Sequence, residues 1–531
     1  MKRLWMSGVL LLLSFSSIKN LQAAAGDLDP LFDGDGSVFT DIASTSDVGY
    51  RVIVQPDGKI IVVGNALNNS GQNNMALVRY NPNGSLDPTF GTGGIVSTSI
   101  NNLVSDLVLQ SDGKILVSTG GFIFRFNPNG SVDPTFGSGG NVSVISTAIA
   151  LQSDGKILTA GSSANDFAVI RLNPNGSLDP TFGSGGQVTS DLGGADSAYD
   201  IGVQPDSKIV AFGMTNQAAA VVRYNPNGSL DPTFGSGGIV TTLVPGGFFT
   251  ALKIQIDGRI LIGGDVQDES IVDGGDSDFA MLRYNPNGTP DPTFGTNGQI
   301  IHDIGDNENF TDFDVQSNGK IVAIGTIIGN TSDFALLRCN SNGSPDITFG
   351  NGGIVTTDFS GENDSALAVT IQSDGFIIVA GTSRTADDDF AVARYEGDLI
   401  ILTCNRYIDV FEDSVLATDW TYVKPAWSEA AGSLIGTPTG GKAEAIATPA
   451  FAGCSTAPCT FQTSIQTAGG VSNKIFFFGW FQDKQNTVEV LMKEQNDKWV
   501  LRQRAGGVVV AKTKSSQNIL PNVSYDVKVD F

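Results

Sequence analysis

One eleven-residue motif recurs along this chain, and the recurrence constrains the fold more than any other feature of the sequence. Full, near-full or partial copies of NPNGSLDPTFG start at seven positions: Leu28, Asn81, Asn127, Asn173, Asn225, Asn285 and Asn340. A second motif, Q-x-D-G-K-I or a close variant, starts at Gln55, Gln110, Gln152, Gln204, Gln255, Gln316 and Gln372. Seven copies of each, about 40 to 60 residues apart, predict a repeat architecture in which each repeat folds into the same small unit.

The third repeat shows the strands of one unit most clearly. Short apolar runs at residues 148–152, 156–160, 167–172 and 187–190 predict four β-strands. Between the first two strands, Q-S-D-G-K has the residues of a tight hairpin turn with Gly in the left-handed position. Between the last two, the Asn, Pro and Gly of NPNGSLDPTFG each favour a turn. We therefore predict four antiparallel strands per repeat.

The ends of the repeat region indicate how the units assemble. The region begins with the tail of a unit, near Leu28, and its last unit stops at Tyr395 before any such tail. An N-terminal strand at residues 36–40 would complete the last unit and remove both exposed sheet edges. We predict an all-β, seven-bladed β-propeller closed by this strand over residues 27–397. An open solenoid would need distinct capping units, and none is visible.

The motifs Q-x-DGKI, F-A-x-x-RYN and DPTFG resemble the delta-60 repeat family, which occurs in exported bacterial proteins and is regarded as β-propeller-forming. The resemblance covers about residues 27–396. It implies a propeller and export, and it implies no catalytic residue, because the family has no generally established activity.

Two charged positions recur once in every repeat. The third strands carry Arg79, Arg125, Arg171, Arg223, Arg283, Arg338 and Arg394. The DPTFG motifs and their variants carry Asp29, Asp87, Asp133, Asp179, Asp231, Asp291 and Asp346. We expect each Arg to pair with the nearby Asp, because a buried guanidinium needs a carboxylate or carbonyls to offset its lost hydration. An anion site is the alternative, but equal copies in every repeat favour a structural role.

The remaining composition bounds the compartment and the partners. Residues 1–25 resemble a bacterial secretory signal peptide, with Lys2 and Arg3, an apolar run and an Ala-Ala-Ala cleavage site, so we expect a secreted or cell-surface protein without a membrane span. A net charge of −24 argues against nucleic-acid partners, which require a basic surface. Cys454 and Cys459 are close enough to form a disulfide, Cys339 occupies a packing position, and the state of Cys404 is left open.

The catalytic inventory is small. His302 is the single His, which excludes a His-cluster metal site, and we expect it at an exposed strand end. No H-E-x-x-H, G-x-S-x-G or P-loop sequence occurs. No catalytic residue and no metal-ligand set is predicted.

The two faces of the predicted propeller differ. The Q-x-D-G-K and NPNGS turns both follow strands of the same direction and form what we call the repeat face. Loops on the opposite, variable face differ in every blade, and binding usually lies on such loops. The long acidic loop at residues 265–278 carries four predicted ligand-binding residues: Asp268, Glu269, Asp273 and Asp276. Carboxylates attract positive charge, so we expect a cation or basic partner, with calcium the small ligand they would favour.

After residue 397 the repeat motifs stop. Residues 398–531 contain alternating runs such as KIFFFGWFQD and TVEVLMKEQ, which predict antiparallel strands of a sandwich. Their order and the FED…W opening resemble concanavalin A-like, laminin-G-like jelly-roll modules. The sequence ends within a strand-like run, so we expect an incomplete jelly roll. The E-x-D-x-E strand of glucanases in this superfamily is missing, which favours a binding module.

Two function classes follow. The first is an exported, non-catalytic binding or surface-interaction protein, monomeric, with the propeller as a platform and the jelly roll binding a glycan or a cell-surface protein. The alternative is a polysaccharide-active enzyme, a glycoside hydrolase or lyase, using two carboxyl groups of the variable face about 5–10 Å apart.

Overall fold

The computed structural model describes residues 24–42, 46–68, 70–268, 276–305, 307–359, 361–384 and 387–398, and the backbone of eight strands between Trp420 and Asp530. The chain divides into two compact units, Met1–Leu399 and Ile400–Phe531. Most of the predicted signal peptide, together with Cys404, Cys454 and Cys459, lies outside the described residues. Within the described part, no helix is long and apolar enough to cross a membrane.

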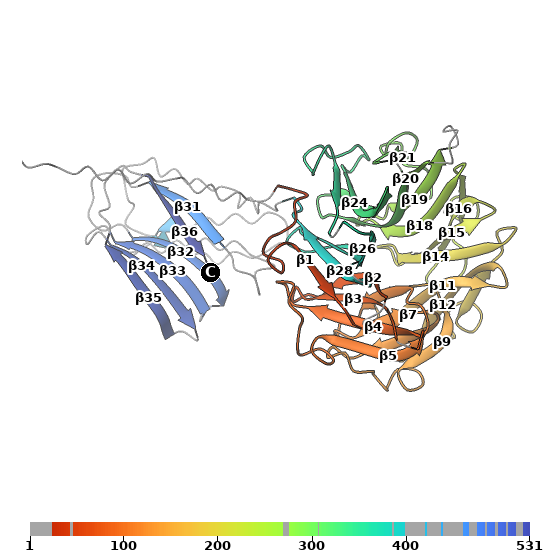
Figure 1. Ribbon diagram of the computed structural model, residues 1–531, viewed down its shortest axis with the longest axis horizontal. Coiled ribbons are helices and arrows are strands. Elements are labelled where there is room, and N and C mark those ends of the chain that lie inside the picture. The colour runs from red at the N-terminus through yellow and green to blue at the C-terminus, as the bar shows by residue number, and fades with distance from the viewer. Residues whose placement is uncertain are drawn as a thin grey trace, which may run out of the picture. The chain divides into compact units, whose positions relative to one another are not determined.

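The first unit is a seven-bladed β-propeller of four-stranded antiparallel sheets, as the repeats predict (Figure 1). Blade one consists of β2 (Asp47–Val54), β3 (Ile60–Leu67), β4 (Asn73–Tyr80) and β5 (Ile95–Asn101). Blade two consists of β6 (Asp106–Leu109), β7 (Ile115–Ser118), β8 (Gly120–Phe126) and β9 (Asn141–Ser146). Blade three consists of β10 (Ala148–Leu151), β11 (Ile157–Ser163), β12 (Asp166–Leu172) and β13 (Gln187–Ser190).

The remaining four blades repeat this order. Blade four consists of β14 (Asp196–Val203), β15 (Ile209–Thr215), β16 (Ala218–Tyr224) and β17 (Ile239–Leu243). Blade five consists of β18 (Gly247–Ile254), β19 (Ile260–Asp268), β20 (Asp276–Tyr284) and β21 (Gln299–His302). Blade six consists of β22 (Glu308–Val315), β23 (Ile321–Ile328), β24 (Ser332–Cys339) and β25 (Ile354–Thr357). Blade seven consists of β26 (Asp364–Ile371), β27 (Ile377–Arg384), β28 (Asp388–Tyr395) and the N-terminal β1 (Ser37–Thr40).

The N-terminal strand closes the ring as predicted. β1 pairs antiparallel with β28, with Val38 opposite Val392. The backbone pairing continues beside the strand, because Gly26 N–H donates to the Glu396 carbonyl and Glu396 N–H donates to the Asp27 carbonyl, both at 2.8 Å. Blade seven is therefore built from both ends of the repeat region, and this removes its exposed edge.

The hydrophobic core lies between neighbouring blades. Phe212 and Val221 of blade four, for example, pack with Phe249 and Ile262 of blade five in one buried cluster. The innermost strand of each blade packs against that of the next around the whole ring. This arrangement leaves the loops of both faces free to vary without changing the core.

The Q-x-D-G-K turns form the tight hairpins that their residues predict. In blade one, Gly58 N–H donates to the Gln55 carbonyl at 2.9 Å, and Gly58 adopts a φ of +81°. Blade four carries Ser207 at the equivalent position, and Ser207 adopts a φ of +68°. Glycine favours this left-handed conformation, whereas serine is strained in it.

The second unit is also antiparallel. A four-stranded meander contains β32 (Ile475–Asp483), β33 (Asn486–Lys493), β34 (Lys498–Ala505) and β35 (Val508–Ser516). Two further pairs join β31 (Thr460–Gln466) to β36 (Ser524–Asp530), and β29 (Trp420–Thr421) to β30 (Thr437–Pro438). The strands are those of an all-β unit, and the jelly roll remains a prediction.

Candidate functional site

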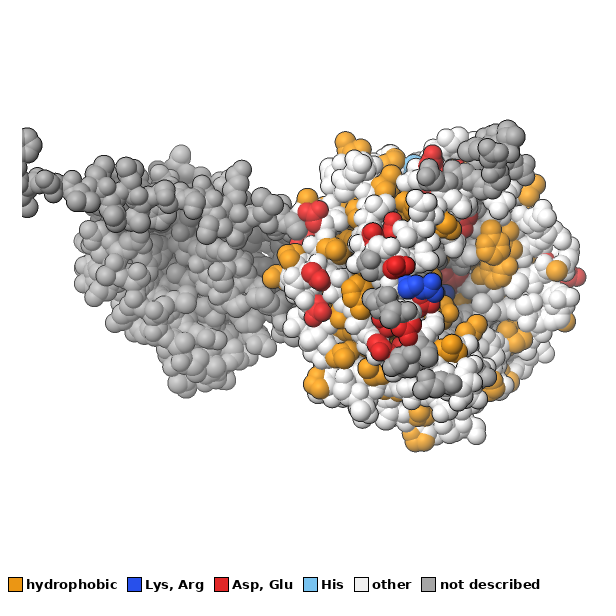
Figure 2. Space-filling model, viewed as in Figure 1, with side chains coloured by type: hydrophobic (Ala, Val, Ile, Leu, Met, Phe, Trp, Pro, Cys, Tyr) orange, Lys and Arg blue, Asp and Glu red, His pale blue; other side chains and the backbone are white. Residues whose placement is uncertain are grey.

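The variable face of the propeller carries a concentration of acidic side chains near its centre, with basic side chains among them (Figure 2). The acidic loop predicted to bind ligand lies in blade five. Asp268 ends β19 and Asp276 begins β20, and the strand register places these two residues opposite each other. Glu269 and Asp273 lie outside the described residues. The ligand-binding role of the four acids therefore stays a prediction.

The same hairpin carries a further acid, Asp265, within β19. Its Oδ1 accepts a hydrogen bond of 2.6 Å from the Phe310 N–H of blade six. Burial raises the pKa of Asp265 to about 7, although the bond from Phe310 acts in the opposite direction. Asp265 thus joins two blades and changes charge near neutral pH.

A second group of charges lies on the innermost strands. One position of the innermost strands lies four residues before the Gln of the Q-x-D-G-K motif. In blades one to seven it holds, in order, Arg51, Asp106, Ala148, Asp200, Ala251, Asp312 and Ala368. Acidic residues therefore alternate with Ala around the ring from blade two to blade seven. Two positions further along the strands, blade five carries Lys253 and blade six carries Asp314. We call Arg51, Asp106, Asp200, Lys253, Asp312 and Asp314 the axial charge cluster.

The alternation has a structural cause, which the backbone hydrogen bonds make clear. Asp106 accepts the N–H of Ile149 in the next blade at 2.7 Å. Asp200 and Asp312 make the same bond to the next blade, with Leu252 at 2.8 Å and Val369 at 3.1 Å. In each case the next blade carries Ala just before the donor, and its small side chain leaves room for the carboxylate. The three aspartates therefore tie neighbouring inner strands together.

The two basic groups of the cluster have loose ion pairs. Arg51 Nε lies 3.9 Å from Asp106 Oδ1, and Lys253 Nζ lies 3.8 Å from Asp314 Oδ1. Both basic side chains keep substantial exposure, 41% for Arg51 and 37% for Lys253. Burial and the nearby Asp106 raise the pKa of Asp200 to about 7. With four carboxyl groups and two bases, the cluster favours positive charge over negative charge.

Three further groups of aspartates recur at blade junctions on the variable face. In each group one Asp lies on a third strand, one follows a fourth strand and one opens the first strand of the next blade. Their carboxylate oxygens lie within 4.8 Å of one another. We call them the carboxylate triads: Asp166, Asp191 and Asp196; Asp333, Asp358 and Asp364; and Asp41, Asp47 and Asp389.

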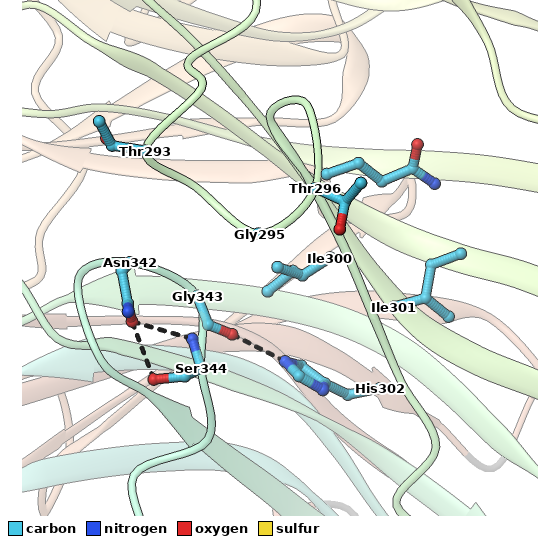
Figure 3. A pocket seen from close by; sticks show the side chains of 10 residues that line it. Thr293, Gly295, Thr296, Ile300, Ile301, His302, Asn342, Gly343 and Ser344 are labelled. Carbon is cyan, nitrogen blue, oxygen red and sulfur yellow. Dashed lines mark hydrogen bonds between the residues drawn. The ribbon is translucent and has the colours of Figure 1, made fainter.

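The repeat face offers shallow grooves rather than an enclosed site. One groove of about 390 Å³ lies between blades five and six and is lined in part by Thr296, His302 and Gly343 (Figure 3). His302 is half-buried at the end of β21, where its Nε2 donates to the Gly343 carbonyl at 2.8 Å, so the expected exposure of its ring is wrong. A groove of about 620 Å³ uses equivalent residues of blades three and four. The groove recurs because its lining residues belong to the repeat, so it gives no reason to expect one specific ligand there.

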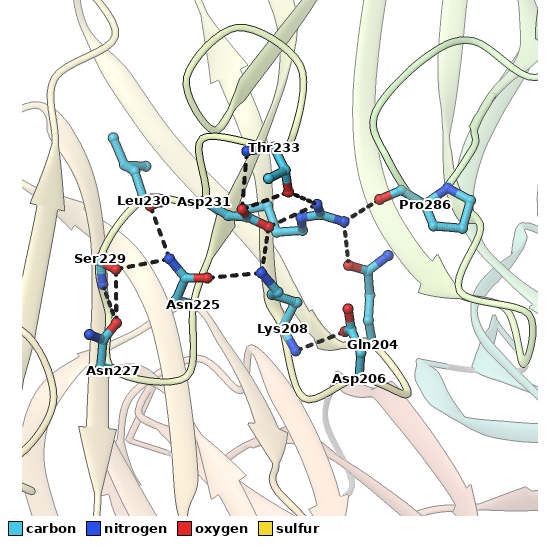
Figure 4. Close-up of polar contacts among 11 residues, drawn as sticks. Gln204, Asp206, Lys208, Asn225, Asn227, Ser229, Leu230, Asp231, Thr233 and Pro286 are labelled. Carbon is cyan, nitrogen blue, oxygen red and sulfur yellow. Dashed lines mark hydrogen bonds and ion pairs between the residues drawn. The ribbon is translucent and has the colours of Figure 1, made fainter.

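Beneath the repeat face, the recurring Arg of every repeat lies beside the recurring Asp. In blade four, Arg223 Nη2 lies 2.8 Å from Asp231 Oδ2, and the guanidinium also donates to Gln204 and to the Pro286 carbonyl of the next blade. Figure 4 shows the polar contacts around Asp231, which Lys208 and Thr233 also approach. All seven Arg and all seven Asp of these sets are buried. Each of the seven Arg therefore forms an ion pair with the Asp of its set.

Two further contacts complete each set. The guanidinium lies over the ring of the Phe in DPTFG, as Arg125 does over Phe136 at 4.5 Å from the ring centroid. Burial alone would raise the pKa of Asp133, but hydrogen bonds from Thr135 and the charges of Arg125 and Lys114 lower it to about 2. Each recurring Arg thus already has a carboxylate partner, which argues against a free anion site at the Arg positions.

The set of blade six differs from the others because it faces blade seven, which is split between the two ends of the repeat region. The guanidinium of Arg338 would meet the NPNGS turn of the next blade, but blade seven has no such turn after Tyr395. Asp398 approaches the same guanidinium instead, with its Oδ1 2.8 Å from Arg338 Nη2 and its Oδ2 2.7 Å from Lys320 Nζ. Cys339, at the end of the same strand, is a buried free thiol among the described residues, which fits its predicted packing role.

Comparison with known sequences bears on the repeats. A sequence model of the family described as "Domain of unknown function (DUF5122) beta-propeller" matches residues 55–90, 110–136, 152–182, 204–234, 255–294 and 316–349. These residues are therefore similar to the repeats of that β-propeller family. The match confirms that the motifs mark propeller repeats. It includes residues of blades one to six and none of blade seven. No curated protein matches the sequence.

Solved structures similar to this chain share little sequence identity with it. Virginiamycin B lyase from Staphylococcus aureus is 12% identical, with 67% of this chain and 98% of the lyase covered and a TM-score of 0.42. The extracellular domain of a proposed one component system from B. thetaiotaomicron is 14% identical, with coverage of 67% and 40% and a TM-score of 0.39. A structure described as YCF48 bound to D1 peptide is 11% identical, with coverage of 71% and 100% and a TM-score of 0.40.

Sequence reasoning missed the axial charge cluster and the carboxylate triads. The signal for the cluster was present, because Asp106, Asp200 and Asp312 hold the same place relative to the Q-x-D-G-K motif. The triads combine residues from two blades and three strands, so they show no local spacing in the sequence. A repeat-by-repeat alignment of strand ends would have found both.

Proposed function

We propose that this chain is an exported, non-catalytic binding protein whose propeller presents its variable face to a cation or a basic partner. The observation that supports this most is the difference between the two faces. Turns of the repeat face are near-identical and hold the internal Arg–Asp pairs. The variable face carries blade-specific loops and acidic side chains around the axis (Figure 2).

The charge of the variable face supports a positive ligand. β19 ends and β20 begins at this face, at Asp268 and Asp276, and the exposed acids Asp41, Asp191 and Asp358 lie there too. Such a surface raises the local concentration of cations and repels anions, which affects both affinity and the rate of association. We propose that the second unit adds a carbohydrate- or protein-binding jelly roll and that residues 1–25 direct export.

A direct test compares two variants with equal changes of charge. In the first, Asp268, Asp273 and Asp276 are replaced by Asn and Glu269 by Gln. In the second, the four exposed turn residues Asp57, Asp112, Asp154 and Asp206 of the repeat face are replaced by Asn. Both variants and the parent are screened on a glycan array and against basic and acidic peptides, at low and physiological salt.

The proposal expects binding of a basic or cationic ligand by the parent, loss of at least tenfold in affinity for the first variant, and parent-like affinity for the second. Equal losses for both variants would indicate nonspecific charge attraction and contradict a site on the variable face. Loss confined to the second variant would place the ligand on the repeat face.

The enzymatic alternative has one observation in its favour, the carboxyl group of Asp200 with a pKa of about 7 near Asp106. Both oxygens of Asp200 accept backbone hydrogen bonds, from Ile201 at 2.7 Å and from Leu252 at 2.8 Å. An acid–base catalyst must reach its substrate, and these two bonds tie the carboxyl group to the backbone of two inner strands. We therefore favour binding, and a polysaccharide hydrolase and lyase assay run with Asp200→Asn is the check, because loss of a measured turnover in this variant would favour the enzyme.

A further inference from the structure

We propose that the carboxylate triads bind divalent cations at the blade junctions, with calcium as the cation that their ligands fit best. The inference rests on the triads themselves and does not depend on the ligand of the variable face. It assigns a structural metal site to residues from two blades, none of which belongs to the acidic loop between β19 and β20.

The triad between blades three and four gives the clearest geometry. Asp166 begins β12, Asp191 directly follows β13, and Asp196 begins β14 in the next blade. One oxygen of each lies within 4.8 Å of the other two. Calcium–oxygen distances are about 2.3–2.6 Å, so two oxygens on one ion can be up to about 5 Å apart. Three carboxylates at this separation can therefore reach a single ion.

Asp196 supplies a second and independent observation. The residue is 2% exposed, and its Oδ2 accepts the Leu192 N–H at 2.6 Å. Its Oδ1 is also buried but accepts no hydrogen bond from the described residues. A buried carboxylate oxygen without a donor is unfavourable, because it has lost its hydration and gained nothing in return. A cation between the three side chains would satisfy this oxygen.

The charge of this triad has no compensation within the described residues. Neither Lys nor Arg forms an ion pair there with Asp166, Asp191 or Asp196, whereas each buried Asp beneath the repeat face has an Arg. Three carboxylates so close together repel one another. Asp191 is exposed, so the site is open to solvent and an ion can enter.

The same arrangement is present at two other junctions. Asp47 Oδ2 accepts the Ile42 N–H at 2.6 Å, and Asp364 Oδ2 accepts the Phe359 N–H at 2.9 Å, as Asp196 does with Leu192. In the Asp364 triad, as in the other two, one carboxylate oxygen of each residue lies within 4.8 Å of the other two. The arrangement is therefore built into the repeat at selected junctions.

The ligand set points to a hard cation. All contributed ligands are carboxylate oxygens, which suit calcium, magnesium and manganese rather than zinc or copper. Calcium accepts irregular coordination by six to eight oxygens, whereas magnesium demands near-octahedral geometry and is reluctant to lose water. Three carboxylates on three different strands, with remaining positions open to water, fit calcium best.

Calcium binding by the full chain can be measured by isothermal titration calorimetry and by the change in Tm between EDTA and CaCl2, with MgCl2 in parallel. Asp166→Asn, Asp191→Asn and Asp196→Asn are compared with the parent. Asn at position 196 keeps an oxygen for the Leu192 N–H, so the loop is retained. Asp154→Asn, an exposed change on the repeat face, is the matched control, and Asp268→Asn with Asp276→Asn tests the acidic loop.

The proposal expects saturable calcium binding and a Tm that rises with calcium. Each triad variant should lose one equivalent of calcium or at least tenfold in affinity at one site. In EDTA its Tm should equal or exceed that of the parent, because one repulsive charge is gone. Asp154→Asn should behave as the parent. The proposal is overturned if no divalent cation binds, if Asp196→Asn binds calcium as the parent does, or if only the Asp268 and Asp276 changes abolish binding.

Discussion

At the scale of single residues, the chain uses buried aspartates in two different environments. Arg and Asp beneath the repeat face are buried together and saturate each other. In the axial charge cluster the printed ion pairs are longer, 3.8 and 3.9 Å, and burial raises the pKa of Asp200, and that of Asp265 in blade five, to about 7. We expect the first set to stabilise the fold and the second to make the stability of the propeller depend on pH.

Arg223→Ala tests the structural set. It leaves Asp231 buried with only Lys208 and Thr233 as partners, and it removes the bond to the Pro286 carbonyl of the next blade. We expect a loss of about 3–5 kcal/mol in the free energy of unfolding, measured by urea denaturation. Arg384→Ala, at an exposed i,i+4 pair with Asp388, should cost less than about 1 kcal/mol. Equal costs for the two changes would contradict a structural role for Arg223.

Asp265→Asn tests the pH dependence. A carboxyl group whose pKa is raised by folding holds its proton more tightly in the native state, so it lowers stability as pH rises from about 4 to about 7. Asn cannot ionise and keeps an oxygen for the Phe310 N–H. The variant should match the parent near pH 4 and become progressively more stable than it up to about pH 7, with a constant difference above. A difference that is independent of pH would refute the shift.

At the scale of elements, the strands and turns could be predicted because the same pattern of apolar runs and turn residues recurs in seven repeats. In the third repeat, the predicted strand at residues 187–190 is β13, and the predicted strand at residues 167–172 is β12 with one more residue at its start. The triads escaped prediction because Asp166, Asp191 and Asp196 meet only through strand pairing and blade packing. The acidic loop could be recognised by composition, but composition carries no information on where its side chains converge.

Ser207→Gly tests the turn of blade four. Serine at a φ of +68° is strained by about 1–2 kcal/mol, and glycine costs about 0.5–1 kcal/mol in backbone entropy. The change should therefore raise the free energy of unfolding by about 0.5–1 kcal/mol. Gly155→Ser is the reverse change in blade three, where a Cβ would meet only Pro174 at an ordinary 3.6 Å, and it should lower stability by a similar amount. Same-sign effects of the two substitutions would exclude backbone strain as the cause.

At the scale of the whole molecule, ring closure is the feature on which the other contacts depend. The two ends of the repeat region meet in blade seven, where Arg394 pairs with Asp29 and β1 completes the sheet. Seven copies of both motifs, split between the ends, were sufficient to predict this closure. The number of blades follows from counting, whereas the stabilising contact of Asp398 with Arg338 could be seen only in three dimensions.

Removal of residues 24–40 tests the closure. This deletion exposes the edge of β28 and leaves Arg394 without Asp29, so we expect a fall in Tm of at least about 10 °C and self-association of the exposed edge. Calorimetry and size-exclusion chromatography give the two readouts. A chain that lacks only residues 1–23 is the control and should retain the parent Tm. A monomeric deletion variant with unchanged Tm would mean that β1 does not close the ring.

The split blade also sets an order in time. The ribosome makes β1 at the start of the propeller and its partner β28 about 350 residues later, which corresponds to roughly 20–70 s at about 5–20 residues per second. During this interval the growing chain cannot form its seventh blade, and its newest sheet edge stays open to unwanted partners. If the chain is threaded through a membrane while it is unfolded, the ring can close only after both ends have reached the same side. Folding is then confined to the compartment of destination, and an incompletely transported chain is left without its final blade.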